Sequence, residues 1–131
     1  MTETLSSLLW VTLGAAIGGP LRFFLSGFVG RRIGETFPWG TFAVNVSGAF
    51  IIGAFGAFAL TRGLTSASAP WLFFVTGVLG SYTTVSSFSL QTLALVRDGE
   101  RLPALANAGL SLGACVVSAA AGFALASMMV R

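Results

Sequence analysis

The chain has 131 residues, of which 55% are hydrophobic and 8% are charged, and its mean hydropathy is +0.90. Soluble proteins carry about 25% charged residues, so this composition excludes a disordered chain and argues against a soluble enzyme. All basic residues are arginines, and they do not cluster into a basic patch, which argues against nucleic-acid binding. With no histidine and Cys115 as the single cysteine, the sequence offers neither a His/Cys metal site nor an internal disulfide.

Charged residues divide the chain into apolar stretches, and a membrane-spanning helix needs about 20 residues. The stretches are Thr4 to Leu21, Thr36 to Thr61, Gly63 to Val96 and Leu102 to Val130. The first reaches the required length only by continuing past Arg22 to Val29. Because Glu3 stands where a signal peptide has basic residues, and further spans follow, we expect a mature first helix. We predict one all-α domain over residues 1–131, with four transmembrane helices in lipid and multi-pass insertion in the inner membrane.

The predicted connections, Gly30 to Pro38, Thr61 to Pro70 and Arg97 to Pro103, are short enough to make neighbouring helices antiparallel. The charges that set orientation are Arg31, Arg32, Arg97 and Arg101 on one side, against Arg62 and Arg131 on the other. Under the positive-inside rule, this difference in arginine number only weakly favours placing both termini outside the cytoplasm. It also suits a chain that inserts in both directions and pairs with an inverted copy, so the orientation stays undecided.

Glycines are placed for close helix packing, which drives association in lipid. They form G-x-x-x-G pairs in the first and fourth stretches and thin out the second: Gly14 and Gly18, Gly109 and Gly113, and Gly48, Gly53 and Gly56. We expect most of them to be packing surfaces without a direct part in chemistry.

A dense hydroxyl cluster, Ser81 to Ser89, lies near the middle of the third stretch, directly after Gly77 and Gly80. Polar groups at that depth need partners, and glycine releases the backbone from helical geometry, so we predict a broken third helix with free carbonyls and amides. The alternative is a continuous helix whose hydroxyls bond back to i−4 carbonyls. The density of the cluster favours the break.

Two further polar features can face this segment. Asn45 lies four residues after Thr41 on one helical face, and a stripe of small residues recurs in the fourth stretch at Ser111, Cys115, Ser118 and Gly122. Interhelical packing is the alternative for both. Together with the hydroxyl cluster they predict a polar track through the bilayer.

The track contains no carboxylate, histidine or lysine, which argues against proton coupling and against a divalent-cation site. Amide, hydroxyl and aromatic-edge donors suit a small anion, whereas free carbonyls at the break suit a small cation. Both ions can coexist, with the cation as a fixed structural charge.

These residues resemble the Fluc/CrcB family of fluoride ion channels. The resemblance runs in order along almost the whole chain: Gly18-Gly19-Pro20-Leu21-Arg22, Trp39-Gly40-Thr41 with Asn45 and Gly48, Gly77-Val78-Leu79-Gly80, and Thr83-Thr84-Val85-Ser86-Ser87-Phe88-Ser89. Their order, spacing and four-span layout are specific in combination.

The resemblance implies a passive fluoride channel and not an enzyme: a homodimer of oppositely inserted subunits, with two fluoride pores along the subunit boundaries. It also implies one sodium ion on the two-fold axis, held by the backbone carbonyls of Gly80 and Thr83. Asn45 would donate to fluoride, and Phe88 would present its ring edge. The other residues expected on the fluoride pathway are Thr41, Tyr82, Thr84, Val85, Ser111 and Cys115, with Arg22 either in an anion-attracting vestibule or snorkelling to the interface.

The chain departs from the family's helix-three string, Thr-Thr-Phe-Ser-Thr-Phe-Ser followed by an acid. Val85 stands at the first phenylalanine, Ser87 at the second threonine, Gln91 at the acid, and Ser81 at a glycine. Val85 has no ring quadrupole, so one aromatic contact to the ion should be missing, although Tyr82 lies three residues earlier.

Two alternatives to a homodimeric channel are open at this point. The chain could be a degenerate subunit that supports a heterodimeric partner with an intact pore. It could also be a small multidrug antiporter, another four-helix dual-topology dimer, but that class requires a membrane carboxylate. The only acids here, Glu3, Glu35, Asp98 and Glu100, lie at the tail or in loops.

Overall fold

The computed structural model describes residues 2–34 and 36–130, and every described element is helical. The elements are α1 (Thr2–Ile33), α2 (Trp39–Thr61), α3 (Ala69–Trp71), η1 (Leu72–Leu79), α4 (Gly80–Tyr82), α5 (Val85–Arg97) and α6 (Arg101–Met129). Of the residues used in the charge arguments, Glu35 and Arg131 lie outside the described part. The prediction of an all-α chain is confirmed.

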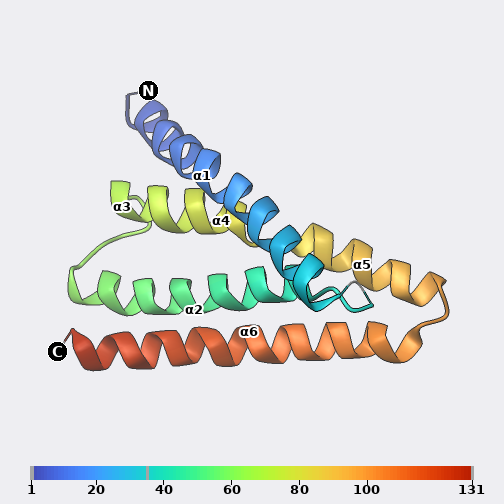
Figure 1. Cartoon of the computed structure of the whole chain (residues 1–131). Helices are drawn as coiled ribbons and strands as arrows, with labels where there is room; N and C mark the ends of the chain where they lie inside the picture. Colours follow the sequence, from blue (N-terminus) through green and yellow to red (C-terminus); the bar gives the residue numbers. More distant parts are fainter. Residues whose placement is uncertain (1, 35, 131) are drawn as a thin grey trace.

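The chain runs back and forth along one direction (Figure 1). Helices α2 and α6 lie side by side, and the segment from α3 to α5 runs in the opposite direction to both, while α1 crosses it obliquely. The α1–α2 and α5–α6 connections lie toward one end of the molecule. Both termini and the α2–α3 connection lie at the other end, as the short connections predicted.

Glycines bring the long helices into backbone contact. A Cβ added at Gly53 would collide with the carbonyl of Ala119, and one at Gly122 with the carbonyl of Phe50, so α2 and α6 touch through their main chains. Ser118 adds a hydrogen bond of 2.9 Å from its Oγ to the carbonyl oxygen of Val46. The predicted packing role is therefore confirmed for these positions.

The G-x-x-x-G pair of α1 packs in the same way. A Cβ at Gly14 would collide with the carbonyl of Phe73 and would lie 2.8 Å from the Cα of Gly77, and one at Gly18 would collide with the carbonyl of Val78. The pair in α6 differs, because a Cβ at Gly109 or Gly113 would meet no described atom within 4 Å. Within this chain, the α6 pair is not a packing surface.

The third apolar stretch is not one regular helix. Its first half is wound as a π-helix over η1, and helical geometry stops at Thr83 and Thr84, whose ψ angles are 158° and 121°. The expectation that Gly77 and Gly80 release the backbone is wrong, because both lie inside helical segments. Gly77 serves the contact with α1, and the interruption follows three residues after Gly80.

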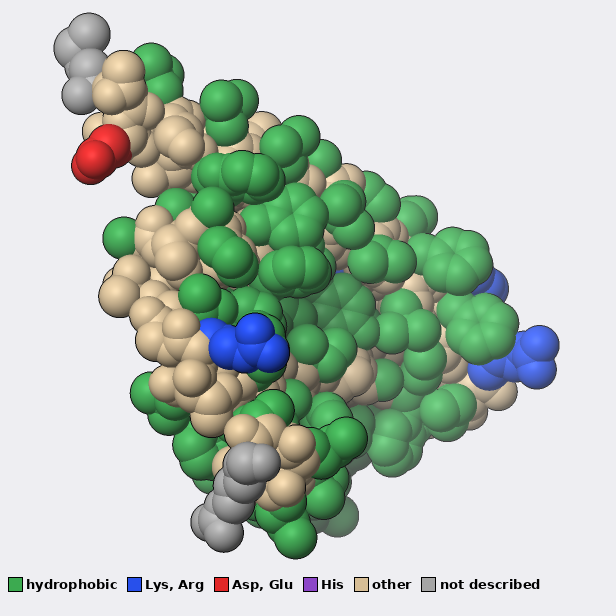
Figure 2. All heavy atoms as spheres, turned by 90° about the vertical axis from the view of Figure 1, so that its left-hand side faces the viewer, with side chains coloured by type: hydrophobic (Ala, Val, Ile, Leu, Met, Phe, Trp, Pro, Cys, Tyr) green, Lys and Arg blue, Asp and Glu red, His purple; other side chains and the backbone are tan. Residues whose placement is uncertain are grey.

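Within residues 2–34 and 36–130, three helices are long and apolar enough to cross a membrane: α1, α2 and α6. The third stretch does not qualify as a single helix, because the interruption divides it into the helical run from Ala69 to Tyr82 and the 13-residue α5. Large hydrophobic side chains are exposed along all these elements, and Figure 2 shows one face covered mostly by hydrophobic groups, with few charged ones. The apolar surface exceeds what soluble monomers expose, so lipid or another protein must cover it.

The buried core is small and lies where α2 meets the third segment. Val44, Leu79 and Tyr82 form its centre, with Leu25 of α1 packed against them. The Tyr82 hydroxyl lies 2.8 Å from Ser47 Oγ, so the phenol has a partner inside this apolar environment. This core holds the end of α4 against α2, directly before the interruption.

Candidate functional site

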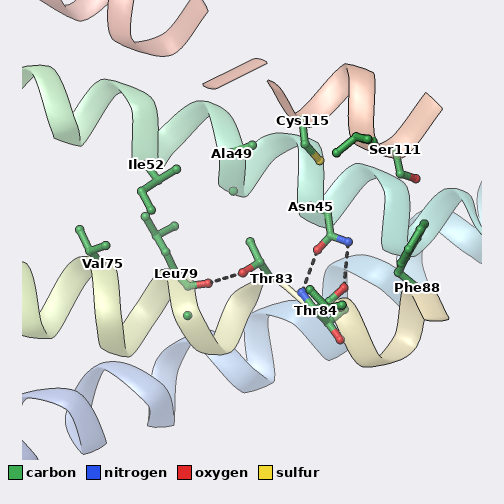
Figure 3. A pocket seen from close by; sticks show the side chains of 14 residues that line it. Asn45, Ala49, Ile52, Val75, Leu79, Thr83, Thr84, Phe88, Ser111 and Cys115 are labelled. Carbon is green, nitrogen blue, oxygen red and sulfur yellow. Dashed lines mark hydrogen bonds between the residues drawn. The ribbon is translucent and has the colours of Figure 1, made fainter. Parts of the chain in front are cut away.

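The interruption after α4 is held by one side chain, Asn45 of α2. Its Nδ2 donates to the carbonyl oxygen of Thr84 at 2.9 Å, and its Oδ1 accepts from the Thr84 amide at 2.8 Å (Figure 3). The side-chain amide thus pairs with both polar backbone groups of one residue, as a neighbouring strand would. Since Asn45 lies within a helix and Thr84 is 7% exposed, these backbone groups are satisfied without water.

Thr84 also begins the next helix. Its Oγ1 accepts a hydrogen bond of 3.2 Å from the Ser87 amide, as expected of an N-cap residue with extended dihedral angles. The neighbouring Thr83 donates from its Oγ1 back to the carbonyl of Leu79 at 2.9 Å. The hydroxyl-to-i−4-carbonyl hydrogen bond, which we considered from the sequence as the alternative to a broken helix, therefore occurs at Thr83 together with the interruption.

The interruption leaves backbone carbonyls without helical partners. In a continuous helix the Thr84 amide would donate to Gly80 and the Ser87 amide to Thr83, but these amides donate instead to Asn45 Oδ1 and Thr84 Oγ1. Among the described residues, no other donor reaches either carbonyl. A Cβ at Gly80 would meet only the Val75 carbonyl, at 3.6 Å, so the space beside this residue is open.

A hollow of about 380 Å³ lies between α2, the interruption and α6. Eight of the predicted site residues line it: Asn45, Gly80, Thr83, Thr84, Val85, Phe88, Ser111 and Cys115. They come from three separate parts of the sequence, and Figure 3 shows Phe88 near Ser111 and Cys115 close to Asn45. Val85 stands at the open side, with 77% of its surface exposed.

A second hollow, of about 480 Å³, receives two other predicted residues, Arg22 and Thr41. It also contains Arg31 and Ser87, and it shares Thr84 with the first hollow. Thr41 and Asn45 therefore face different hollows although they are one helical turn apart.

Tyr82 lines neither hollow. Its ring belongs to the core and its hydroxyl contacts Ser47, so the structure does not bring it to the position of the missing aromatic contact. Ser118 and Gly122, which continue the α6 stripe, contact α2 and leave only Ser111 and Cys115 at the hollow.

Sequence reasoning missed Asn107. It is 2% exposed, accepts a hydrogen bond of 3.2 Å from Ser111 Oγ and donates to Thr92 Oγ1 at 2.8 Å. The signal was present, because Asn107 is an amide in an apolar stretch, one helical turn before Ser111 and comparable to Asn45. Gln91, which stands where the family has an acid, has a buried Oε1 without a partner among the described residues.

The described groups around the first hollow are uncharged. Amide, hydroxyl, thiol and main-chain carbonyl groups can replace a small ion's hydration shell, but none of them exchanges protons readily near neutral pH. The fold and this site define a class: a multi-pass membrane protein with an uncharged polar path beside a helix interruption.

Comparison with known proteins gives the family within this class. Residues 9–123 match the family described as CrcB-like protein, Camphor Resistance (CrcB), and the chain belongs to this family. It is 60% identical to "Fluoride-specific ion channel FluC 2" of Rhodopseudomonas palustris over 98% of this chain and 99% of that protein. It is 56% identical to "Fluoride-specific ion channel FluC 2" of Bradyrhizobium diazoefficiens, over 93% and 90% of the two chains.

Membership confirms the resemblance read from the sequence, the multi-pass location in the inner membrane and the prediction that the chain is not an enzyme. It also removes the multidrug antiporter as an alternative.

Replacing Asn45 by Leu is expected to release the interruption. The variant keeps the side-chain volume approximately but leaves the buried amide and carbonyl of Thr84 unpaired, and each lost hydrogen bond is worth about 1 kcal/mol. Two such bonds correspond to about 2 kcal/mol, so we expect amide hydrogen exchange in the Thr83–Ser87 segment to become roughly thirtyfold faster, measured by mass spectrometry on detergent-solubilised protein. Ser118→Ala, which removes one hydrogen bond to the Val46 carbonyl of the same helix, is the control. Equal exchange in Asn45→Leu and the unchanged protein would contradict the role of Asn45.

Proposed function

We propose that the chain is a passive fluoride channel that lowers fluoride in the cytoplasm. The observation that carries this proposal is the uncharged hollow beside the Asn45–Thr84 pair, and the names of the relatives support it. A small, strongly hydrated anion crosses hydrocarbon only if polar donors replace its water. The hollow offers such donors without a positive side chain that would retain the ion.

Asn45 still has a donor for the ion. Its amide has two N–H groups, and Thr84 uses one, so the second is available on the side that lines the hollow. Phe88 adds the positive edge of its ring, and Ser111 and Cys115 add a hydroxyl and a thiol from α6. Because no group on this path titrates near neutral pH, movement of fluoride follows its gradient alone.

The second hollow is the entrance. Arg22 and Arg31 give it positive potential, which raises the local concentration of anions. Thr41 and Ser87 add hydroxyls, and Thr84 lies at the boundary with the first hollow. This arrangement favours the vestibule role of Arg22 over snorkelling.

The pore is completed by a second copy of the chain in the opposite orientation. Val85 is 77% exposed at a hollow that lacks an outer wall within this chain, and the α6 glycines Gly109 and Gly113 have open space beside them. A two-fold related copy closes both hollows at once and gives two pores per dimer. The third segment, from Ala69 to Arg97, is then the third of four membrane passes, interrupted at mid-membrane.

A sodium ion on the dimer axis fits the free carbonyls. Gly80 and Thr83 each have a carbonyl without a described donor, and the described residues contain no cluster of three His, Cys, Asp or Glu side chains. Hard monovalent cations prefer oxygen ligands of this kind. Bound there, sodium would supply a fixed positive charge between the subunits.

Val85 favours one variation of this proposal. If the ring edge missing at Val85 is essential, the chain acts as a supporting subunit whose partner carries the intact aromatic pair. The homodimer and the heterodimer differ in one measurable property, conduction by the purified chain alone.

Fluoride efflux from liposomes tests conduction and the effect of Val85. We expect the purified chain to release fluoride, but not chloride, faster than empty liposomes, measured with an ion-selective electrode. Val85→Phe restores an aromatic contact worth about 1 kcal/mol, so it should raise the fluoride rate about fivefold. Val85→Leu adds bulk without a quadrupole and is the matched control. Absence of efflux from both the chain and Val85→Phe would overturn the homodimeric channel, and an equal gain from Val85→Leu would contradict the ring-edge explanation.

Labelling from one side of the membrane tests the inverted dimer. Ser66, exposed in the α2–α3 connection, is replaced by Cys in a Cys115→Ala background. If both orientations occur, a membrane-impermeant maleimide should label about half of the protein in intact spheroplasts and all of it after permeabilisation. Complete labelling, or none, in intact spheroplasts would mean a single orientation.

Thermal unfolding in different salts tests the cation site. A ligand that binds only the folded state raises the apparent melting temperature with its concentration. We expect sodium to raise it relative to an equal concentration of N-methylglucamine, whose cation is too large for the carbonyls. Identical melting temperatures across the sodium titration would argue against the site.

A further inference from the structure

Asn107 is a buried amide that the proposed pore does not use. It is 2% exposed in the middle of an apolar surface of α6, where an unpaired amide would be costly. Its hydrogen-bond partners are Thr92 of α5 and Ser111 at the first hollow, so Asn107 connects elements and does not merely fill space.

Three hydrogen bonds follow one another through Asn107, the first along α6, the second from α6 to α5 and the third along α5. Ser111 Oγ donates to Asn107 Oδ1 at 3.2 Å, and Asn107 Nδ2 donates to Thr92 Oγ1 at 2.8 Å. Thr92 Oγ1 in turn donates to the carbonyl oxygen of Phe88 at 2.7 Å. This series of hydrogen bonds starts at Ser111 and ends at the backbone of Phe88, and both residues line the first hollow.

Apolar packing alone does not fix α5. No residue of α5 is buried, although the helix carries Phe88. Among the described residues, Asn107–Thr92 is the only side-chain hydrogen bond that joins α5 to α6. Phe88 and Thr92 are four residues apart in α5 and therefore share one face of the helix, whose N-cap is Thr84. Asn45 holds Thr84 and Asn107 holds Thr92, and Phe88 lies midway in sequence between these two residues.

We propose that Asn107 is a positioning residue for the fluoride pathway, acting through Thr92 on Phe88 and directly on Ser111. This inference rests on the proposed fluoride channel. Asn107 sets the rotation of α5 about its own axis and so aims the Phe88 ring at the hollow. Asn107 also accepts a hydrogen bond from Ser111, whose hydroxyl has only one hydrogen. This hydroxyl must therefore turn away from Asn107 to donate to an anion.

The test compares variants of both partners in the full-length protein. Asn107→Leu removes the amide, and Thr92→Val removes only the hydroxyl at nearly constant volume. Thr92→Ser keeps the hydroxyl and is the conservative rescue. Ser118→Ala, which loses one hydrogen bond between α6 and α2 outside the first hollow, is the matched control.

We expect fluoride efflux from liposomes to fall about tenfold in Thr92→Val and further in Asn107→Leu, which also loses the contact with Ser111, and the double variant should match Asn107→Leu because Thr92 acts only through its link with Asn107. Thr92→Ser and Ser118→Ala should stay within about twofold of the unchanged chain. Unchanged efflux in Thr92→Val, or losses that multiply in the double variant, would overturn the inference. If Asn107→Leu does not assemble, the Thr92→Val and Thr92→Ser pair decides.

Hydrogen exchange on the same samples separates this inference from the proposed function. Asn107→Leu should accelerate exchange across α5, and Ser118→Ala should not, whether or not the protein conducts. Absent wild-type efflux with faster α5 exchange would reject the channel and retain the positioning of α5 by Asn107. Unchanged α5 exchange would reject the positioning role.

Discussion

The pairing of one side-chain amide with both backbone groups of Thr84 is the constraint on which the site depends. In hydrocarbon, a helix can stop only if its open amides and carbonyls find partners. Asn45 provides a donor and an acceptor from a neighbouring regular helix, so α4 can end and α5 can start in a new direction. The direction of α5 then places Phe88 at the hollow, and the amides diverted from the helix leave the Gly80 and Thr83 carbonyls open.

The few buried polar groups of this molecule serve mainly to join one helical segment to another. Almost every buried hydroxyl and amide has an assigned partner, and these partners join different segments: Ser47 with Tyr82, Ser118 with Val46, and Asn107 with Thr92. Glycines let the main chains touch, and single hydrogen bonds then fix the rotation of each helix. The rigidity of the site thus comes from a few directed bonds at close backbone contacts, because lipid provides no hydrophobic force between helices.

Sequence reasoning gave the helical class, the extents of α2 and α6, the close packing at Gly14 and Gly18, and most residues of the first hollow. These follow from hydropathy and from polar residues that stand out against apolar surroundings. It misplaced the origin of the interruption, because glycine's freedom was weighed over a long-range amide contact that no local pattern reveals. It overlooked Asn107 although an amide in an apolar stretch marks that position, and only the contact with Thr92, 15 positions away, could not be read from a local pattern.

The π-helical winding of η1 has a consequence for how this chain tolerates change. Each turn of a π-helix holds one more residue than an α-helical turn, so the segment stores extra chain length between the α1 contact and Thr83. Deleting a residue from Leu72–Leu79 can therefore be absorbed by tightening to α-helical winding, which leaves Gly80 to Tyr82 at their present rotation, whereas the same deletion in a regular α-helix turns all following residues by roughly 100°. This segment thus tolerates a change of length that the regular helices of the chain do not.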